Sequence, residues 1–253
     1  MSKTEIECLN FIKKNANNTK IYFGINFEEF EFIKQVLSGV TKTKGTVFPD
    51  FVFEKGFIEH FRVTSSSESK REKGSEHLKS IAEYNKKKDK DFKNFMNDDS
   101  SQELTKIHQY CAHSYKNFCI SFDRQIRNKI KKMNQYTGSK ENVIFMIDYS
   151  DFALRMKEDK CRDIEGILIG DYGCGVIEDD YRLSRDKKML LNIYNKFKDE
   201  IHYIIFKNRT LAEIIKVDSI PILVTFLPFE YIVIANGNTI VRDYFRKVSV
   251  SYE

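Results

Sequence analysis

Two acidic residues, Asp50 and Glu59, lie in the segment FPDFVFEKGFIEHFRV, which is otherwise rich in aromatic and β-branched residues. Such a segment with a short polar break predicts a pair of β-strands. Side chains alternate between the two faces of a strand. The residues that would share the face of Glu59 are Phe57, Phe61 and Val63. Because an unpaired carboxylate on an apolar face is costly, Glu59 is expected to be protonated, hydrogen-bonded or bound to a cation.

The expected strands are residues 46–53 and 57–64, joined by the polar turn EKG. Pairing centred on the middle of that turn would set Phe51 opposite Glu59 and leave Asp50 one place out of direct register. A bulge or a strand end would still let both carboxylates reach one ion.

Converging carboxylates bind Mg²⁺ or a similar hard cation, which can activate water against a phosphodiester. A plainer alternative needs no ion. In it, Asp50 lies in a loop after Pro49, and Glu59 lies at an exposed sheet edge and pairs with Arg62 or Lys55. The spacing alone leaves both interpretations open.

The elements that must position these acids follow from hydrophobic periodicity, which predicts an α/β protein. Helices are expected at about 5–15, 26–39, 102–133 and 185–200, and buried strands at 143–150 and 201–207. The longest of these helices rests on a stripe of residues three or four apart: Leu104, Ile107, Cys111, Tyr115, Phe118, Phe122, Ile126 and Ile130. Residues 66–100 carry many charges and few large apolar residues, which predicts an exposed, mobile insertion that holds one solvated helix at most.

No linker divides the chain, so we expect residues 1–253 to form a single α/β domain. Its nuclease-like core would span about 20–150, and residues 151–253 would extend the same domain. A hydrophobic content of 41% excludes a disordered chain. No apolar run reaches membrane-span length and no secretion signal is found, so a cytoplasmic protein without a membrane partner is expected. Five cysteines without CxxC pairing predict reduced thiols.

Pro49-Asp50 followed by Glu59 and Phe61 resembles the PD-(D/E)XK motif of restriction-endonuclease-like nucleases. The expected order of helix, hairpin, long helix and buried strand is similar to the α-β-β-β-α-β core of that superfamily. The resemblance implies that Asp50 and Glu59 hold Mg²⁺ or Mn²⁺. It also implies an acid from the first core helix, for which Glu31 is preferred over Glu28 and Glu29.

The sequence departs from the motif at Phe61, where the family has a lysine. A phenyl ring cannot orient water or neutralise developing negative charge. Either Lys73 or Lys70, from the segment that follows the hairpin, supplies the missing amine, or catalysis has been lost.

The net charge of +5 permits an anionic partner without requiring one. The resemblance implies a DNA-cleaving enzyme like those of bacterial restriction or defence. Candidate contacts to DNA phosphates are Arg62, Lys70, Arg71, Arg182 and Arg185. A non-catalytic module that binds nucleic acid or protein on a degenerate nuclease scaffold is the alternative, and an interaction protein with no nucleic-acid role is a third. A homodimer is a further expectation.

Overall fold

A computed structural model describes most of the chain. The described residues are 3–45, 47–66, 76–98, 103–109, 112–149, 151, 153–159, 176–227, 232–235 and 240–247. Within these ranges, no helix combines the length and the apolar character that crossing a membrane requires. The protein is α/β, as the sequence predicts.

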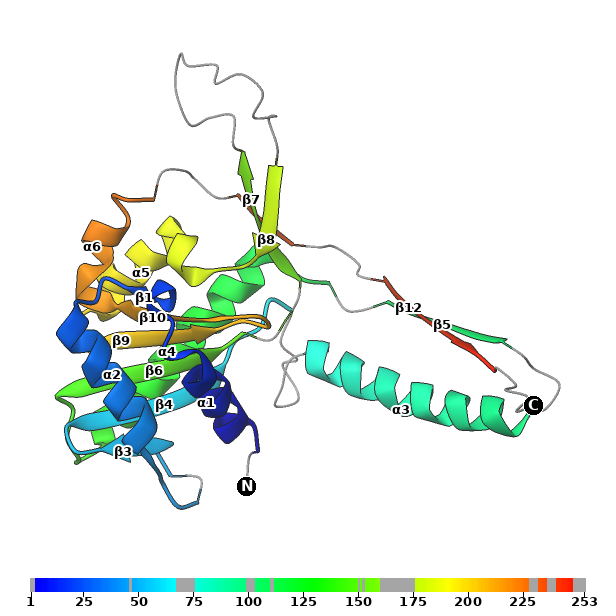
Figure 1. The fold of residues 1–253 in the computed structure, drawn as a ribbon, viewed down its shortest axis with the longest axis horizontal. Coiled ribbons are helices and arrows are strands. Elements are labelled where there is room, and N and C mark those ends of the chain that lie inside the picture. The colour runs from blue at the N-terminus through cyan, green and yellow to red at the C-terminus, as the bar shows by residue number, and fades with distance from the viewer. Residues whose placement is uncertain are drawn as a thin grey trace, which may run out of the picture.

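A mixed sheet of seven strands forms the centre of the fold, in the order β1-β10-β9-β6-β4-β3-β2 (Figure 1). Its strands are β1 (Tyr22–Phe23), β2 (Thr41–Lys42), β3 (Phe51–Phe53), β4 (Gly56–Arg62), β6 (Asn142–Asp148), β9 (Tyr203–Lys207) and β10 (Ala212–Lys216). β2, β3 and β4 form an antiparallel meander, whereas β4, β6 and β9 run parallel to one another. β10 is antiparallel to β9 and parallel to β1, so both halves of the chain contribute to this sheet.

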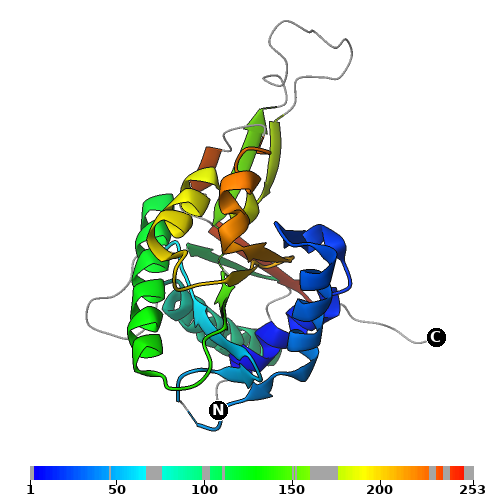
Figure 2. The same ribbon diagram turned by 90° about the vertical axis from the view of Figure 1, so that its left-hand side faces the viewer.

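Helices cover both faces of the sheet, as the turned view shows (Figure 2). One face carries α1 (Lys3–Asn15) and α2 (Phe27–Gly39), and the other carries α4 (Tyr115–Gln135), α5 (Lys187–Phe197) and α6 (Ile220–Leu223). The sheet therefore separates two apolar clusters, and alternate residues of β4 enter each one: Ile58 packs toward α1 and α2, while Phe57 and Phe61 pack toward α4. Burial on both faces explains the unbroken apolar run of β6.

Local capping confirms the expected start of α2. Asn26 accepts a hydrogen bond from the Glu29 backbone N–H, and the Glu29 carboxylate accepts one from the Asn26 backbone N–H. This reciprocal pair satisfies two amides that the helix itself cannot. Short 3₁₀ turns lie at Thr19–Ile21, Leu183–Arg185 and Val217–Ser219.

The hairpin forms, but its register differs by one place from the expected one. The ladder pairs Phe51 with Ile58 and Phe53 with Gly56, so the turn has two residues and the glycine belongs to β4. One step further along this ladder lies Asp50 opposite Glu59. β3 is also shorter than the expected 46–53, because it begins only at Phe51.

The single long helix expected at 102–133 is wrong in its first third. Residues Glu103–Gln109 form β5, and α4 begins at Tyr115 with Ser114 as its N-cap, which accepts a hydrogen bond from the Asn117 backbone N–H. β5 pairs with β12 (Ile240–Arg246), more than a hundred residues away in the sequence. Leu104 and Ile107 match helical spacing by chance, and a distant partner strand decides their conformation.

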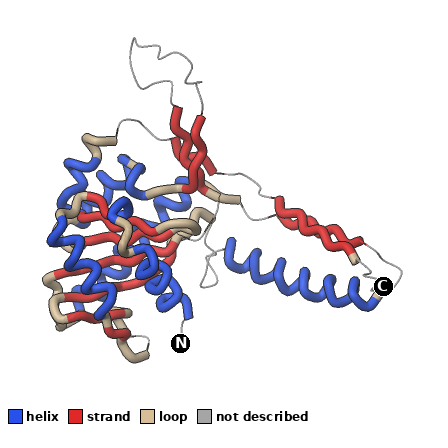
Figure 3. Tube along the Cα trace, in the orientation of Figure 1, coloured by secondary structure: helices blue, strands red, loops and turns tan. Residues whose placement is uncertain are grey.

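Two smaller sheets lie outside the main one (Figure 3). One contains β11 (Ile232–Ala235), β7 (Leu154–Asp159) and β8 (Val176–Asp180), and the other is the β12–β5 ribbon. α3 (Glu76–Asn97) runs beside this ribbon, with the ring centroids of Phe92 and Phe245 5.2 Å apart. The 66–100 segment, expected to be a mobile insertion, thus contains a long helix that packs on the ribbon.

Gly56 provides a test of the close contact between β4 and β6. A Cβ at this position would lie 2.0 Å from the Asn142 backbone oxygen, so β4 can approach β6 here only without a side chain. We expect Gly56→Ala to lower the free energy of unfolding by about 2 kcal/mol or more, because backbone must move.

Gly39→Ala is the matched control, since a Cβ there meets nothing within 4 Å. It should leave stability within about 1 kcal/mol of the wild type. Urea denaturation of both variants measures the difference, and equal effects would contradict this close contact between β4 and β6.

Candidate active site

A cavity of about 690 Å³ opens where the β3–β4 hairpin meets α1 and α4. It is lined by Glu5, Lys42, Thr43, Lys44, Gly45, Val47, Phe48, Asp50, Glu59, Lys129 and Lys132. Both acids singled out from the sequence face this cavity. Lysines outnumber carboxylates in the lining, so the cavity suits an anionic ligand.

Glu59 is buried, with 2% of its surface exposed. Its Oε1 forms an ion pair with Nζ of Lys129 on α4, and its Oε2 accepts a hydrogen bond of 3.0 Å from the Asp50 backbone N–H. The carboxylate is thus held on both sides, which resolves the cost of placing it among apolar neighbours.

Burial raises the pKa of Glu59 from 4.5 to about 7. The Lys129 ammonium opposes this rise, while the nearby negative charge of Asp50 adds to it. The site therefore keeps a carboxyl group that titrates near neutral pH.

The Asp50 side chain continues the hydrogen bonding of β4 beyond the last backbone pair of the β3–β4 ladder. Its Oδ2 accepts a hydrogen bond of 2.8 Å from the His60 backbone N–H, and its own backbone oxygen accepts one of 2.9 Å from the Thr43 N–H. A side chain thus satisfies an amide of β4 that no strand residue reaches. These bonds fix the Asp50 carboxylate beside β4.

Glu5, Asp50 and His60 form a second polar group on the α1 side of β4. Each offers a ligand atom, and these atoms all lie within 4.8 Å of one another. The Glu5 carboxylate also pairs with Lys42 Nζ at 2.5 Å. Among the residues that the structure describes, these three form the one cluster of histidine, cysteine or acidic side chains that could hold a metal ion.

His60 is 8% exposed, and its Nε2 has no hydrogen-bond partner within the described ranges. Burial lowers the pKa of His60, while the negative charges of Asp148, Asp50 and Glu5 oppose this effect. The imidazole is therefore available in its neutral form, which is the form that binds metals.

A buried polar network anchors the N-terminus of α4, the helix that carries Lys129. Asp151 Oδ2 accepts hydrogen bonds from the Ser65 backbone N–H at 2.7 Å and from Thr64 Oγ1 at 2.8 Å. The Ser65 hydroxyl lies 2.8 Å from Nδ1 of His113, and the Ser65 backbone oxygen accepts a bond from the N–H of Ser114, the helix cap. The segment that follows β4 thus positions α4.

The other residues proposed from sequence lie elsewhere. Glu31 does not line the cavity; it pairs with Lys34 at 3.1 Å and faces a different pocket between α1 and α2. The acid that α1 brings to the cavity is Glu5. Lys70, Arg71 and Lys73 fall outside the described residues.

Two of the proposed phosphate contacts pair with acids of the protein itself. Arg62 Nε lies 3.4 Å from the buried Asp148, and Arg182 Nε donates at 2.8 Å to the fully buried Glu213. Arg185 ends the 3₁₀ turn before α5. None of the three lines the cavity.

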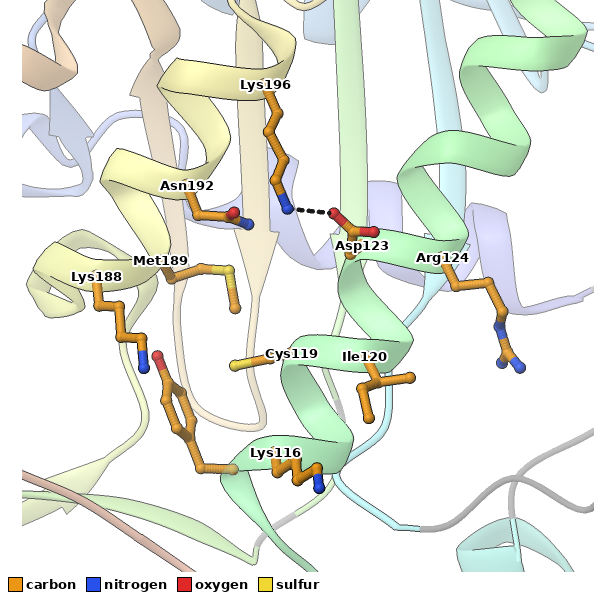
Figure 4. A pocket seen from close by; sticks show the side chains of 10 residues that line it. Lys116, Cys119, Ile120, Asp123, Arg124, Lys188, Met189, Asn192 and Lys196 are labelled. Atoms are coloured by element: carbon orange, nitrogen blue, oxygen red, sulfur yellow. Dashed lines mark hydrogen bonds and ion pairs between the residues drawn. The ribbon is translucent and has the colours of Figure 1, made fainter.

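A second cavity, of about 600 Å³, lies between α4 and α5 (Figure 4). Its one carboxylate, Asp123, is bonded to Lys196 at 3.1 Å and to Arg127 at 2.7 Å. The first cavity has three carboxylates and this one has a single carboxylate, so it offers fewer oxygen ligands for a metal ion.

Comparisons with protein-family models, with curated proteins and with solved structures gave no match.

The sequence did not assign Lys129, Glu5 or His60 to the site, yet the same feature of the sequence marks each of them. Lys129 occupies the apolar stripe of its helix, three residues after Ile126, and Glu5 lies four residues before Leu9 on the buried side of α1. His60 likewise shares a buried face of β4 with Ile58. A polar residue at an apolar position of each element could have indicated that these three side chains point toward a shared site.

The raised pKa of Glu59 predicts how stability depends on pH. Because the folded-state pKa lies above the unfolded value, this group contributes stability that is complete below pH 4.5 and is lost as the pH rises to about 7. Relative to Glu59→Gln, the wild type should lose on the order of 3 kcal/mol across that window and change little above it.

Urea denaturation at pH 5, 6, 7 and 8 measures this difference. Glu54→Gln, in the exposed turn of the same hairpin, is the control and should run parallel to the wild type. Parallel curves for Glu59→Gln as well would contradict the assignment.

Proposed function

We propose that the protein is a metal-dependent phosphodiester hydrolase that acts on DNA and resembles bacterial restriction or defence nucleases. The observation that carries this proposal is the position of Lys129. Its Nζ lies 6.0 Å from the ring centroid of Phe61 and contacts Glu59. The amine of α4 thus stands beside the place where the motif lysine of the superfamily would extend from β4.

The topology supports the same proposal. The elements α2, β2, β3, β4, α4 and β6 follow the α-β-β-β-α-β order of the restriction-endonuclease-like core, with α3 and β5 inserted between β4 and α4. The directions also suit that core, with an antiparallel meander followed by a parallel crossover through α4. Glu59 lies on β4 and Asp50 lies immediately before β3, in the middle of this unit.

Phe61 cannot itself act, because it is 5% exposed and packs edge-on against Phe145, with centroids 5.6 Å apart. With the lysine on α4, the positive charge of Lys129 still lies beside the Glu59 carboxylate, while Phe61, at the motif position on β4, packs in the core. This arrangement favours retained catalysis over the loss that the substitution alone implies.

A divalent cation fits the site at Asp50. Both oxygens of Glu59 are engaged, by Lys129 and by the Asp50 N–H, whereas Asp50 uses one oxygen for the His60 N–H. Glu5 and the unpartnered nitrogen of His60 complete the donor set. When bound, such an ion would polarise the phosphate and lower the pKa of a bound water.

The chain's own groups supply the remaining chemistry. The Lys129 ammonium can stabilise the negative charge that develops on the phosphate, and the Glu59 carboxylate holds that ammonium in place. Lys42, Lys44 and Lys132 surround the cavity and can neutralise neighbouring phosphates of the strand.

Substituting Lys129 tests the proposal. Lys129→Met keeps the length of the side chain and removes its charge, so we expect DNA cleavage with Mn²⁺ or Mg²⁺ to fall by about 100-fold or more. Lys131→Met, at an exposed position two residues along α4 and outside the cavity lining, is the matched control and should stay within about twofold.

Nicking of supercoiled plasmid and of single-stranded DNA provides the measurement. Cleavage that survives in Lys129→Met and Asp50→Asn would overturn the proposed site. Salt-dependent DNA binding without any cleavage would instead favour the non-catalytic binding module, because a cavity ringed by lysines binds phosphates whether or not it cuts them.

A further inference from the structure

We propose that Glu5, Asp50 and His60 form a binding site for a transition-metal ion such as Mn²⁺ and bind it in preference to Mg²⁺. The inference deepens the proposed function and rests on it for the role of the ion. The binding itself is measurable without substrate. It replaces the Asp50–Glu59 pair, which the sequence suggested as the metal ligands, with a set on the α1 side of β4.

The spacing of the donors suits one ion. Ligand atoms bound at about 2.1 Å around a shared metal lie about 3 to 4 Å apart. The donor atoms of Glu5, Asp50 and His60 lie within 4.8 Å of one another, so a small movement of these side chains would bring them to that spacing. They come from α1, from the residue before β3 and from β4, and the packed core fixes all three elements.

His60 is the residue that points to a ligand. Its side chain is buried, and a buried polar nitrogen without a partner is destabilising. A metal ion held by Nε2 together with the neighbouring carboxylate pair would give this nitrogen a partner. Histidine nitrogen binds Mn²⁺, Co²⁺ and Zn²⁺ readily, whereas Mg²⁺ prefers an all-oxygen shell that retains several waters.

The charges around the site allow the exchange. The Lys42 ammonium forms an ion pair with the Glu5 carboxylate and also lies 6.0 Å from the ring centroid of Phe51. A divalent ion can displace Lys42 from Glu5 while the lysine keeps its contact with the ring. The exchange replaces one positive charge with two beside two carboxylates.

Isothermal titration of the full chain, freed of metal with EDTA, tests the site with MnCl₂, CoCl₂ and MgCl₂ as probes. We expect one Mn²⁺ to bind at least about tenfold more tightly than Mg²⁺. His60→Asn and Glu5→Gln should each weaken Mn²⁺ by about tenfold or more, and the asparagine variant should lose the preference. Glu7→Gln, an exposed acid on the same helix, is the control and should bind as the wild type does.

Nuclear magnetic resonance gives a reading that needs no variant. Substoichiometric Mn²⁺ should broaden the ring resonances of His60 before those of His202, whose Nδ1 already accepts a hydrogen bond from the Val143 N–H. Equal broadening of both rings, or Mn²⁺ affinity unchanged in both variants, would overturn the site.

The two proposals fail separately. Selective Mn²⁺ binding without any DNA cleavage would remove the hydrolase and keep the metal site. Lys129-dependent cleavage by a protein that shows no preference for Mn²⁺ would keep the hydrolase and remove this donor set.

Discussion

The candidate site depends on the pairing of a buried glutamate with a lysine from another element. Glu59 lies on an interior strand whose faces are both covered, so its carboxylate is largely shielded from water. The Lys129 ammonium and the Asp50 N–H replace that water. Removing either partner would leave a buried charge, or a carboxyl group that stays protonated, which ties the stability of this region to the same contacts that arrange its chemistry.

The alternation of β4 divides this chemistry between two sides of the sheet. Glu59 faces α4 and meets the lysine, whereas His60, the next residue, faces α1 and meets Glu5. Asp50 belongs to both sides, because its N–H binds Glu59 while its carboxylate binds the His60 N–H. One residue at the end of a strand thus links a charge-stabilising half and a metal-binding half.

Local physics predicted much of this arrangement from the sequence, and long-range pairing limited the rest. Period-two alternation identified the hairpin and the buried face of Glu59, and the capping residue Asn26 located α2. The register was wrong by one place because Gly56 joins β4, where only close contact with β6 requires a glycine. β5 was taken for helix because its partner β12 lies at the far end of the chain. The sequence did not assign Lys129 to the site, because a lysine in an apolar stripe has meaning only once a buried carboxylate is known to face it.

The shortness of β2 and β3 explains why this part of the sheet can carry a site at all. A full-length neighbour would cover the edge of β4 and satisfy its amides with backbone, as β6 does along the other edge from Gly56 to Arg62. Here β3 begins only at Phe51, so the Asp50 carboxylate accepts the hydrogen bond of the His60 N–H, and the space beyond opens into the cavity. At this position the sheet has an open edge in place of regular backbone hydrogen bonds, and its charged side chains are held in fixed positions. A site for a charged substrate needs both the access and the fixed charges. The incomplete meander is therefore the structural basis for access, and its side-chain hydrogen bonds keep the opening from collapsing into an ordinary sheet edge.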